Sequence, residues 1–378
     1  MSTNYQRIVV KLGTSVLTGG SDRLNSARMV ELVRQMAVLR QAGTEVILCT
    51  SGAMAAGREH LGFPALSDSM ADKQLLAAVG QTQLIQRWEN LFQIYGLHVG
   101  QLLLTGADLR DRERYLNAQD TLNALLSHGI IPVVNENDAV ATTEIKVGDN
   151  DNLSARAALL GQADLLVLLT DQDGLFDADP RSNPQAQLIE RVDAITPQVL
   201  ALAGGSGTHL GTGGMATKLQ AAQLAQRAGI EVIIAAGGRD NVLLDAFAKR
   251  SVGTRVSAHA NRLESRKQWL LAGPKARGKL ILDSGAVNAI SSQGRSLLAK
   301  GIIDCQGEFE RGALVALHSE TGELLAQGLS RYNANDITRI RGQHSQAIGE
   351  RLGYDYGKVV VHRNDLVLQP VSLAGEQK

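Results

Sequence analysis

The sequence predicts an α/β protein with a mostly parallel sheet, helices on both faces of that sheet, and a smaller β-rich domain after it. Over about the first 260 residues, short apolar runs alternate with helical apolar spacing, giving at least six β-α units. Aromatic residues make up only 3% of the chain, so Ala, Leu, Val and Ile provide the apolar content, which suits helix-covered parallel strands. A chain of 378 residues is long enough for two domains.

Charge and cysteine content exclude several classes of protein. The chain carries 38 basic and 38 acidic residues, so its charge gives no general attraction to nucleic acid or anionic lipid. Cys49 and Cys305 are too few for a disulfide framework or a metal cluster. No apolar run approaches the roughly 20 residues of a membrane span, and the N-terminus lacks a signal-peptide pattern. We therefore expect a soluble, cytoplasmic protein with no membrane partner.

The first predicted strand is Arg7–Leu12, and Gly13 follows it. Lys11 lies inside this apolar strand, where an ammonium is costly unless it leaves the core or meets an anion. Two interpretations stay open. Either Lys11 extends to solvent at the sheet edge, or its charge is directed at a phosphate that the Gly13 amide can approach closely.

Further strands and helices follow in alternation. The predicted strands are 44–49, 98–104, 130–134, 165–169 and 230–235. The predicted helices are 26–42, 70–95, 117–127, a segment after residue 152, and 218–228. Small or polar residues occur where the strands end, near Lys11, Ser51, Asn135 and Thr170. One polar loop alone would be read as a solvated loop, but repetition at the carboxyl ends of parallel strands indicates a ligand site.

Two polar clusters flank the helix and strand within residues 147–180. Asp149 to Asn152 precede the helical stretch, and Asp171 begins an acidic cluster after the strand. The first cluster could simply cap the helix, but one cap does not need four polar residues in a row. A similar run, Asn135 to Asp138, follows an earlier strand and favours hydrogen bonding to a small polar ligand.

A glycine-rich stretch from Gly204 to Gly214 precedes Met215-Ala216-Thr217-Lys218 and a helix. Glycine amides at a helix N-terminus, with a lysine in the first turn, can bind phosphates. The stretch does not match the Walker motif, because Leu219 follows Lys218. A dinucleotide-binding oxidoreductase is excluded, since no G-x-G-x-x-G follows the first strand.

Residues 261–276 are charged and contain Gly273 and Pro274, which predicts a linker. Short strands are predicted beyond it, at 279–282, 313–317, 324–328 and 358–362. From Gly273 onwards the chain has 13 Lys and Arg against 11 Asp and Glu, with no basic cluster. This is a poor electrostatic surface for RNA, so we expect a structural or regulatory module.

Taken in order, six motifs resemble the amino acid kinase superfamily and, within it, the glutamate 5-kinases. They are Lys11-Leu12-Gly13, Ser51-Gly52-Ala53, residues 135–138, residues 148–152, Thr170-Asp171 and residues 211–218. The C-terminal sequence resembles a PUA domain. The resemblance covers nearly the whole chain and implies a three-layer kinase sandwich over residues 1–260, a linker at 261–276 and a small PUA barrel over 277–370.

The resemblance also implies an activity: ATP, with Mg²⁺, phosphorylates the γ-carboxylate of L-glutamate at the first step of proline biosynthesis. It further implies feedback inhibition by proline, and we expect a homo-oligomer, either a dimer or a tetramer. Motif spacing does not distinguish glutamate from the aspartate or acetylglutamate of sister kinases. An RNA-binding protein with a PUA domain remains a rival interpretation.

Matching by motif assigns a role to each candidate residue. Lys11 and Lys218 would lie along the transferred phosphoryl group, and Asp151 would orient both lysines. The residues implied to hold glutamate are Ser51, Asn135, Asp138, Asp149 and Asn150. The residues implied to line the nucleotide site are Lys11, Gly13, Thr170, Asp171, Thr212, Gly213, Gly214, Met215, Ala216, Thr217 and Lys218. No protein metal site is predicted. A carboxylate nucleophile is already ionised at pH 7, so no catalytic base is needed.

Overall fold

The computed structural model describes residues 5–141, 150–203, 214–258 and 276–368. The chain forms two compact units, with the main boundary between Asn261 and Arg262.

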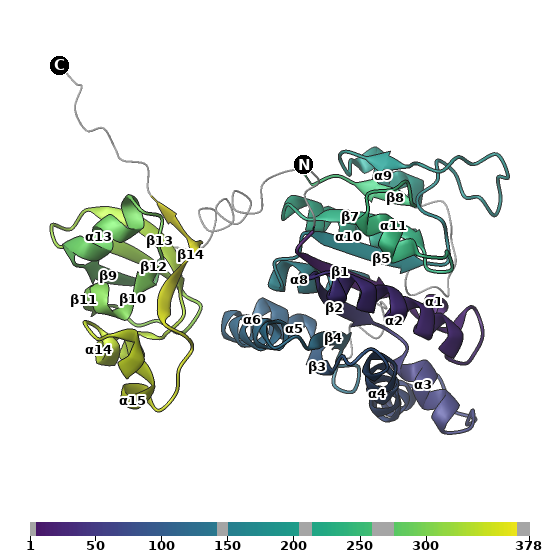
Figure 1. Ribbon diagram of the computed structural model, residues 1–378, viewed down its shortest axis with the longest axis horizontal. Coiled ribbons are helices and arrows are strands. Elements are labelled where there is room, and N and C mark those ends of the chain that lie inside the picture. The colour runs from purple at the N-terminus through teal and green to yellow at the C-terminus, as the bar shows by residue number, and fades with distance from the viewer. Residues whose placement is uncertain (1–4, 142–149, 204–213, 259–275, 369–378) are drawn as a thin grey trace, which may run out of the picture. The chain divides into compact units, whose positions relative to one another are not determined.

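Within the described part of the first unit, the strands form one sheet in the order β3-β4-β2-β1-β5-β7-β8-β6 (Figure 1). Neighbouring strands from β3 to β7 pair in parallel, and only the β7–β8 pair is antiparallel. The predicted mostly parallel sheet is therefore confirmed. The strands are β1 Arg7–Leu12, β2 Glu45–Thr50, β3 Val99–Leu104, β4 Ile131–Glu136, β5 Leu165–Thr170, β6 Arg191–Val192, β7 Glu231–Ala236 and β8 Thr254–Val256.

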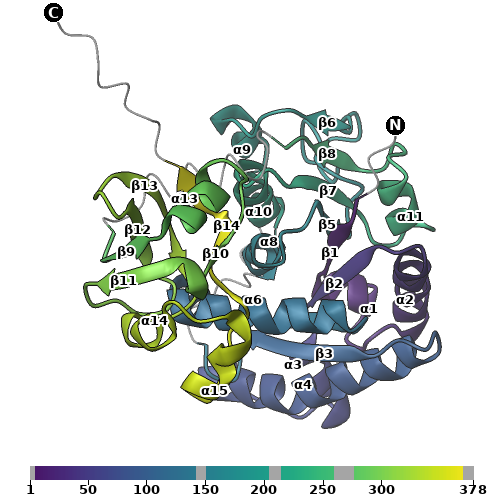
Figure 2. The same ribbon diagram turned by 60° about the vertical axis from the view of Figure 1, so that its left-hand side comes forward.

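Helices cover both faces of this sheet, as Figure 2 shows from the side. The apolar side chains Ile8, Val10 and Leu12 of β1 join a core with residues of α2, α4 and α11. The alternate side chains of β1, including Lys11, point to the opposite face, which α8 covers. The helices are α1 Thr14–Thr18, α2 Ser26–Gln41, α3 Ala53–His60, α4 Met70–Gln93, α5 Gly106–Arg110, α6 Arg112–Ser127, α8 Asn150–Leu160, α9 Pro197–Leu202, α10 Met215–Arg227 and α11 Val242–Phe247.

Several elements differ from the sequence prediction, and three of these differences concern the site. Strand β4 continues to Glu136, so Asn135 belongs to the strand and not to the loop after it. Helix α10 begins at Met215, three residues before the predicted start, so Thr217 and Lys218 lie in its first turn. Helix α3 was not predicted, because its short Ala- and Gly-rich sequence has little apolar periodicity.

The second unit contains a six-stranded sheet in the order β10-β14-β13-β12-β9-β11. Most of its pairs are antiparallel, and register shifts interrupt several of them, which curves a sheet. The expected β-rich module is confirmed. Its elements are β9 Gly278–Leu282, α13 Ser284–Ser291, β10 Leu297–Leu298, η2 Ala299–Gly301, β11 Ile302–Gln306, β12 Leu314–Ser319, β13 Leu324–Ser330, α14 Ala334–Ile340, η3 Ser345–Ala347, α15 Ile348–Leu352 and β14 Val359–Leu368.

Candidate active site

Two buried lysines meet one buried carboxylate at the carboxyl ends of the central strands. The Lys11 Nζ atom from β1 lies 2.5 Å from Asp151 Oδ1, and the Lys218 Nζ atom from α10 lies 3.3 Å from Asp151 Oδ2. Lys11 is 4% exposed, Lys218 5% and Asp151 0%. Lys11 therefore does not extend to solvent at a sheet edge, and that interpretation of the sequence is wrong.

Asp151 lies in the first turn of α8, where the helix dipole favours a negative charge. Its Oδ2 atom also accepts a hydrogen bond from Thr217 Oγ1 at 2.7 Å. Burial raises the pKa of this carboxyl, but attraction to Lys11 and Lys218, together with hydrogen bonds from Lys11 and Thr217, holds the pKa below its usual value. Asp151 is therefore ionised at neutral pH.

For Lys218, the effect of burial on the pKa outweighs the attraction to Asp151. Burial lowers the pKa of its ammonium, and the charge of Lys11 adds to that effect, while Asp151 opposes it. With both lysines protonated, the three side chains carry a net charge of +1. Such a cluster attracts an anion such as a phosphoryl group.

The N-terminus of α10 adds backbone donors to this positive charge. Gly214 is the N-cap residue, and among the described residues no side-chain cap hydrogen bond is made there. A Cβ atom at Gly214 would meet nothing within 4 Å, so the space beside this helix end is open among the described residues. Free amides at a helix N-terminus are a favourable site for phosphate.

A chain of side-chain hydrogen bonds lies beside the charged cluster. Asn150, next to Asp151, donates from Nδ2 to Ser51 Oγ at 2.8 Å and to Asn135 Oδ1 at 3.2 Å. Ser51 precedes Gly52, whose φ of 97° only glycine adopts readily, and α3 begins at the next residue. The structure thus joins the ends of β2 and β4 to the start of α8.

A model of the amino acid kinase family matches residues 6–236. The chain belongs to the amino acid kinase family. A PUA domain model matches residues 278–352.

The chain is 67% identical to a glutamate 5-kinase of Shewanella sediminis, covering 96% of this chain and 98% of that relative. It is 60% identical to a glutamate 5-kinase of Aliivibrio fischeri, covering 97% and 100%. The solved UMP kinase of Bacillus anthracis matches with a TM-score of 0.47 at 15% identity, covering 68% of this chain and 98% of that one.

The other candidate residues of this amino acid kinase site are placed as follows. Thr170 ends β5, is 5% exposed and donates from Oγ1 to Asp171 Oδ1 at 3.0 Å. A Cβ atom at Gly13 would lie 3.5 Å from Lys11 Nζ, so any side chain there would stand beside the ammonium. Asp138 is partly buried in the turn after β4. Asp149, Thr212 and Gly213 lie outside the described residues.

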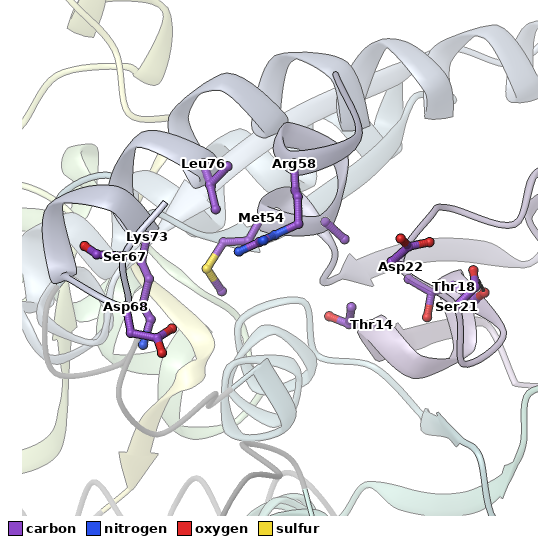
Figure 3. Close-up of a pocket in the computed structure, with 11 residues that line it drawn as sticks. Thr14, Thr18, Ser21, Asp22, Met54, Arg58, Ser67, Asp68, Lys73 and Leu76 are labelled. Atoms are coloured by element: carbon purple, nitrogen blue, oxygen red, sulfur yellow. Dashed lines mark hydrogen bonds between the residues drawn. The ribbon is translucent and has the colours of Figure 1, made fainter. Parts of the chain in front are cut away.

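A cavity of about 260 Å³ adjoins the end of β1 (Figure 3). Thr14 and Thr18 of α1 line it from one side, and Met54, Arg58 and Lys73 line it from α3 and α4. None of the described candidate site residues lines this cavity, so it is distinct from the charged cluster. The sequence prediction contained no signal for it.

The described residues contain neither a membrane-spanning helix nor a cluster of metal ligands. None of their helices has the length and apolar character needed to cross a membrane. They also contain no group of three or more His, Cys, Asp or Glu that could hold a metal ion.

One residue of this site was missed by sequence reasoning. Gln81, on α4, accepts a hydrogen bond at Oε1 from Asn135 Nδ2 at 2.8 Å. It lies 54 positions from Asn135 in the middle of a long helix, and no local pattern marks it.

Proposed function

We propose that this protein uses ATP to phosphorylate the γ-carboxylate of L-glutamate, forming glutamyl 5-phosphate at the first step of proline biosynthesis. The observation that carries the proposal is the buried pair of lysines sharing Asp151, in a chain 60–67% identical to glutamate 5-kinases over nearly its full length. The kinase domain would span residues 1–260, with a linker at 261–276 and a PUA domain at 277–370.

In this proposal Lys11 and Lys218 act on the phosphoryl group in transit. Phosphoryl transfer mainly requires alignment and positive charge where negative charge spreads in the transition state. Asp151 holds both ammonium groups before substrate arrives, so little rearrangement is needed during the reaction. The glutamate carboxylate is ionised at pH 7 and attacks directly, so the site needs no general base.

The amide and hydroxyl groups of Ser51, Asn135 and Asn150 would hold the amino acid. Asp138 and Asp149 carry the negative charge that an ammonium group requires, so either could pair with the α-ammonium of glutamate. The chemistry of these groups fits a small zwitterion better than an apolar ligand.

The nucleotide would lie along Gly13, Thr170, Asp171 and the α10 N-terminus, residues 212–218. Mg²⁺ is usually bound by substrate phosphates, waters and one or two carboxylates, so a site without a three-ligand cluster still fits it. Asp171 directly follows β5 and would be a candidate ligand. When bound with ATP, Mg²⁺ neutralises phosphate charge.

We also propose that proline inhibits the enzyme at or near the glutamate site, that the enzyme is a homo-oligomer, either a dimer or a tetramer, and that it acts in the cytoplasm.

The test is ADP release by the purified protein with glutamate, aspartate or N-acetylglutamate, each with hydroxylamine to trap an acyl phosphate. We expect a hydroxamate with glutamate and much lower rates with the other two. Preference for aspartate or N-acetylglutamate would assign a sister activity, and ATP turnover without hydroxamate would contradict phosphorylation of a carboxylate.

A further inference from the structure

Three side-chain amides form a chain of hydrogen bonds that runs in one direction. Asn150 donates from Nδ2 to Asn135 Oδ1 at 3.2 Å, and Asn135 donates from Nδ2 to Gln81 Oε1 at 2.8 Å. The orientation of the middle amide is fixed, because Asn135 Oδ1 also accepts from the backbone N–H of Glu136 at 2.9 Å. Asn135 itself is only 1% exposed.

Because the hydrogen bonds run in this direction, a donor is left over on Gln81 at one end of the series and an acceptor on Asn150 at the other. The Gln81 Nε2 and Asn150 Oδ1 atoms are both buried, and neither has a hydrogen-bond partner among the described residues. A buried polar atom without a partner is destabilising, and most such atoms in proteins are paired. An amino acid supplies the two missing groups, since its carboxylate accepts hydrogen bonds and its ammonium donates them.

The position of Gln81 is set by a close contact between two helices. A Cβ atom at Gly80 would lie 1.7 Å from the carbonyl oxygen of Ala53, and one at Gly57 would lie 2.0 Å from that of Leu76. Only glycine permits this approach of α4 to α3. Gln81 directly follows Gly80, so the contact also locates Gln81 relative to Ser51 and Gly52, which precede α3.

We propose that Gln81 is a substrate-binding residue of this kinase, whose Nε2 donates a hydrogen bond to a carboxylate oxygen of the amino acid. Its Oε1 meanwhile holds Asn135 in the orientation that binds Asn150. This inference rests on the proposed function, because it concerns the amino acid substrate of the same reaction.

The decisive variant is Gln81→Glu. A glutamate at this position keeps an oxygen that can accept from Asn135 Nδ2, but it replaces the Nε2 donor with a negative charge. The matched control is Gln86→Glu, which makes the same charge change on an exposed part of α4, where Gln86 donates to Asn90. A hydrogen bond to a charged group is worth about 1.5–3 kcal/mol, so we expect Q81E to raise the KM for glutamate about 10- to 150-fold. The KM for ATP should change less than about threefold, and Q86E should match the wild type.

A second variant, Gln81→Met, removes both the donor and the acceptor and serves the same test if Q81E does not fold. Wild-type KM for glutamate in Q81E would overturn the proposal, and so would equal rises in both KM values. A rise in Q81M alone would show that Gln81 only supports Asn135. A wild-type protein without hydroxamate formation would instead refute the proposed function, so the two failures are distinguishable.

Discussion

Replacing Asp151 with Asn tests the charged cluster most informatively, because the change keeps the shape of the side chain and removes only its charge. The two ammonium groups, 4% and 5% exposed, would then share no carboxylate. Removing one partner of a buried ion pair typically costs about 3–5 kcal/mol, so we expect the free energy of unfolding to fall by that amount at pH 7.

The loss should depend on pH in a defined direction. The pKa of Asp151 is lower in the folded protein than in the unfolded chain, so its ionisation stabilises the fold above the unfolded value of about 3.9. That contribution is lost as pH falls through the folded pKa, because the carboxyl is then protonated in both states. The difference in stability between wild type and D151N should therefore be full at pH 5–7 and shrink below about pH 4.

Urea unfolding followed by the fluorescence of Trp88 provides the assay. Trp88 is 0% exposed in the core of the first unit, and a Trp269→Phe background removes the other tryptophan, so the signal reports that unit alone. A difference below about 1 kcal/mol at pH 7 would refute the argument that Asp151 neutralises two buried cations. A difference that stays constant down to pH 3 would refute the assigned direction of its pKa.

Two further predictions concern the substrate side. Asp138→Ala should raise the KM for glutamate far more than the KM for ATP, as steady-state kinetics would measure, and equal rises would exclude Asp138 as an amino acid contact. Gly80→Ala should destabilise the first unit by at least about 1–3 kcal/mol in the same urea assay, because the new methyl group meets the Ala53 carbonyl and the helices must separate. Gly238→Ala is its control in the same unit, since the nearest atom to a Cβ there is Arg28 Nη1 at an ordinary contact distance of 3.5 Å, and this variant should change the stability by less than about 0.5 kcal/mol; equal effects would refute the close contact.

The alternation of apolar runs and helical spacing was enough to predict the centre of the sheet, because β1, β2, β4, β5 and β7 are buried on both faces and each carries its own apolar signal. The short strands β6 and β8 at one end of the sheet have no such signal and were not predicted. Residues at the carboxyl ends of parallel strands lie close together for a related reason: Ser51 follows β2 and Asn135 lies near the end of β4, and both accept a hydrogen bond from Asn150. The sequence could not decide whether Lys11 reaches solvent or an anion, because the answer depends on Asp151, which is 140 positions away.

Helix boundaries and contacts between elements far apart in the sequence were harder to predict from the sequence. Helix α3 escaped prediction because its contact with α4 depends on glycines and a backbone carbonyl, which leave no apolar pattern. Gln81 was missed for a related reason: its only mark is the hydrogen bond to Asn135, formed across two distant elements. Contacts of this kind arise from tertiary packing and are not encoded locally.

The central claim is that Lys11 and Lys218 act together on one phosphoryl group, and a double-mutant cycle on kcat tests it most directly. Lys11→Met and Lys218→Met should each lower kcat about 100- to 1,000-fold, with much smaller changes in the KM for glutamate. Because residues that act as a unit are not additive, the double variant should lose little more than either single one. Wild-type kcat in either single variant, or losses that multiply in the double variant, would contradict the claim.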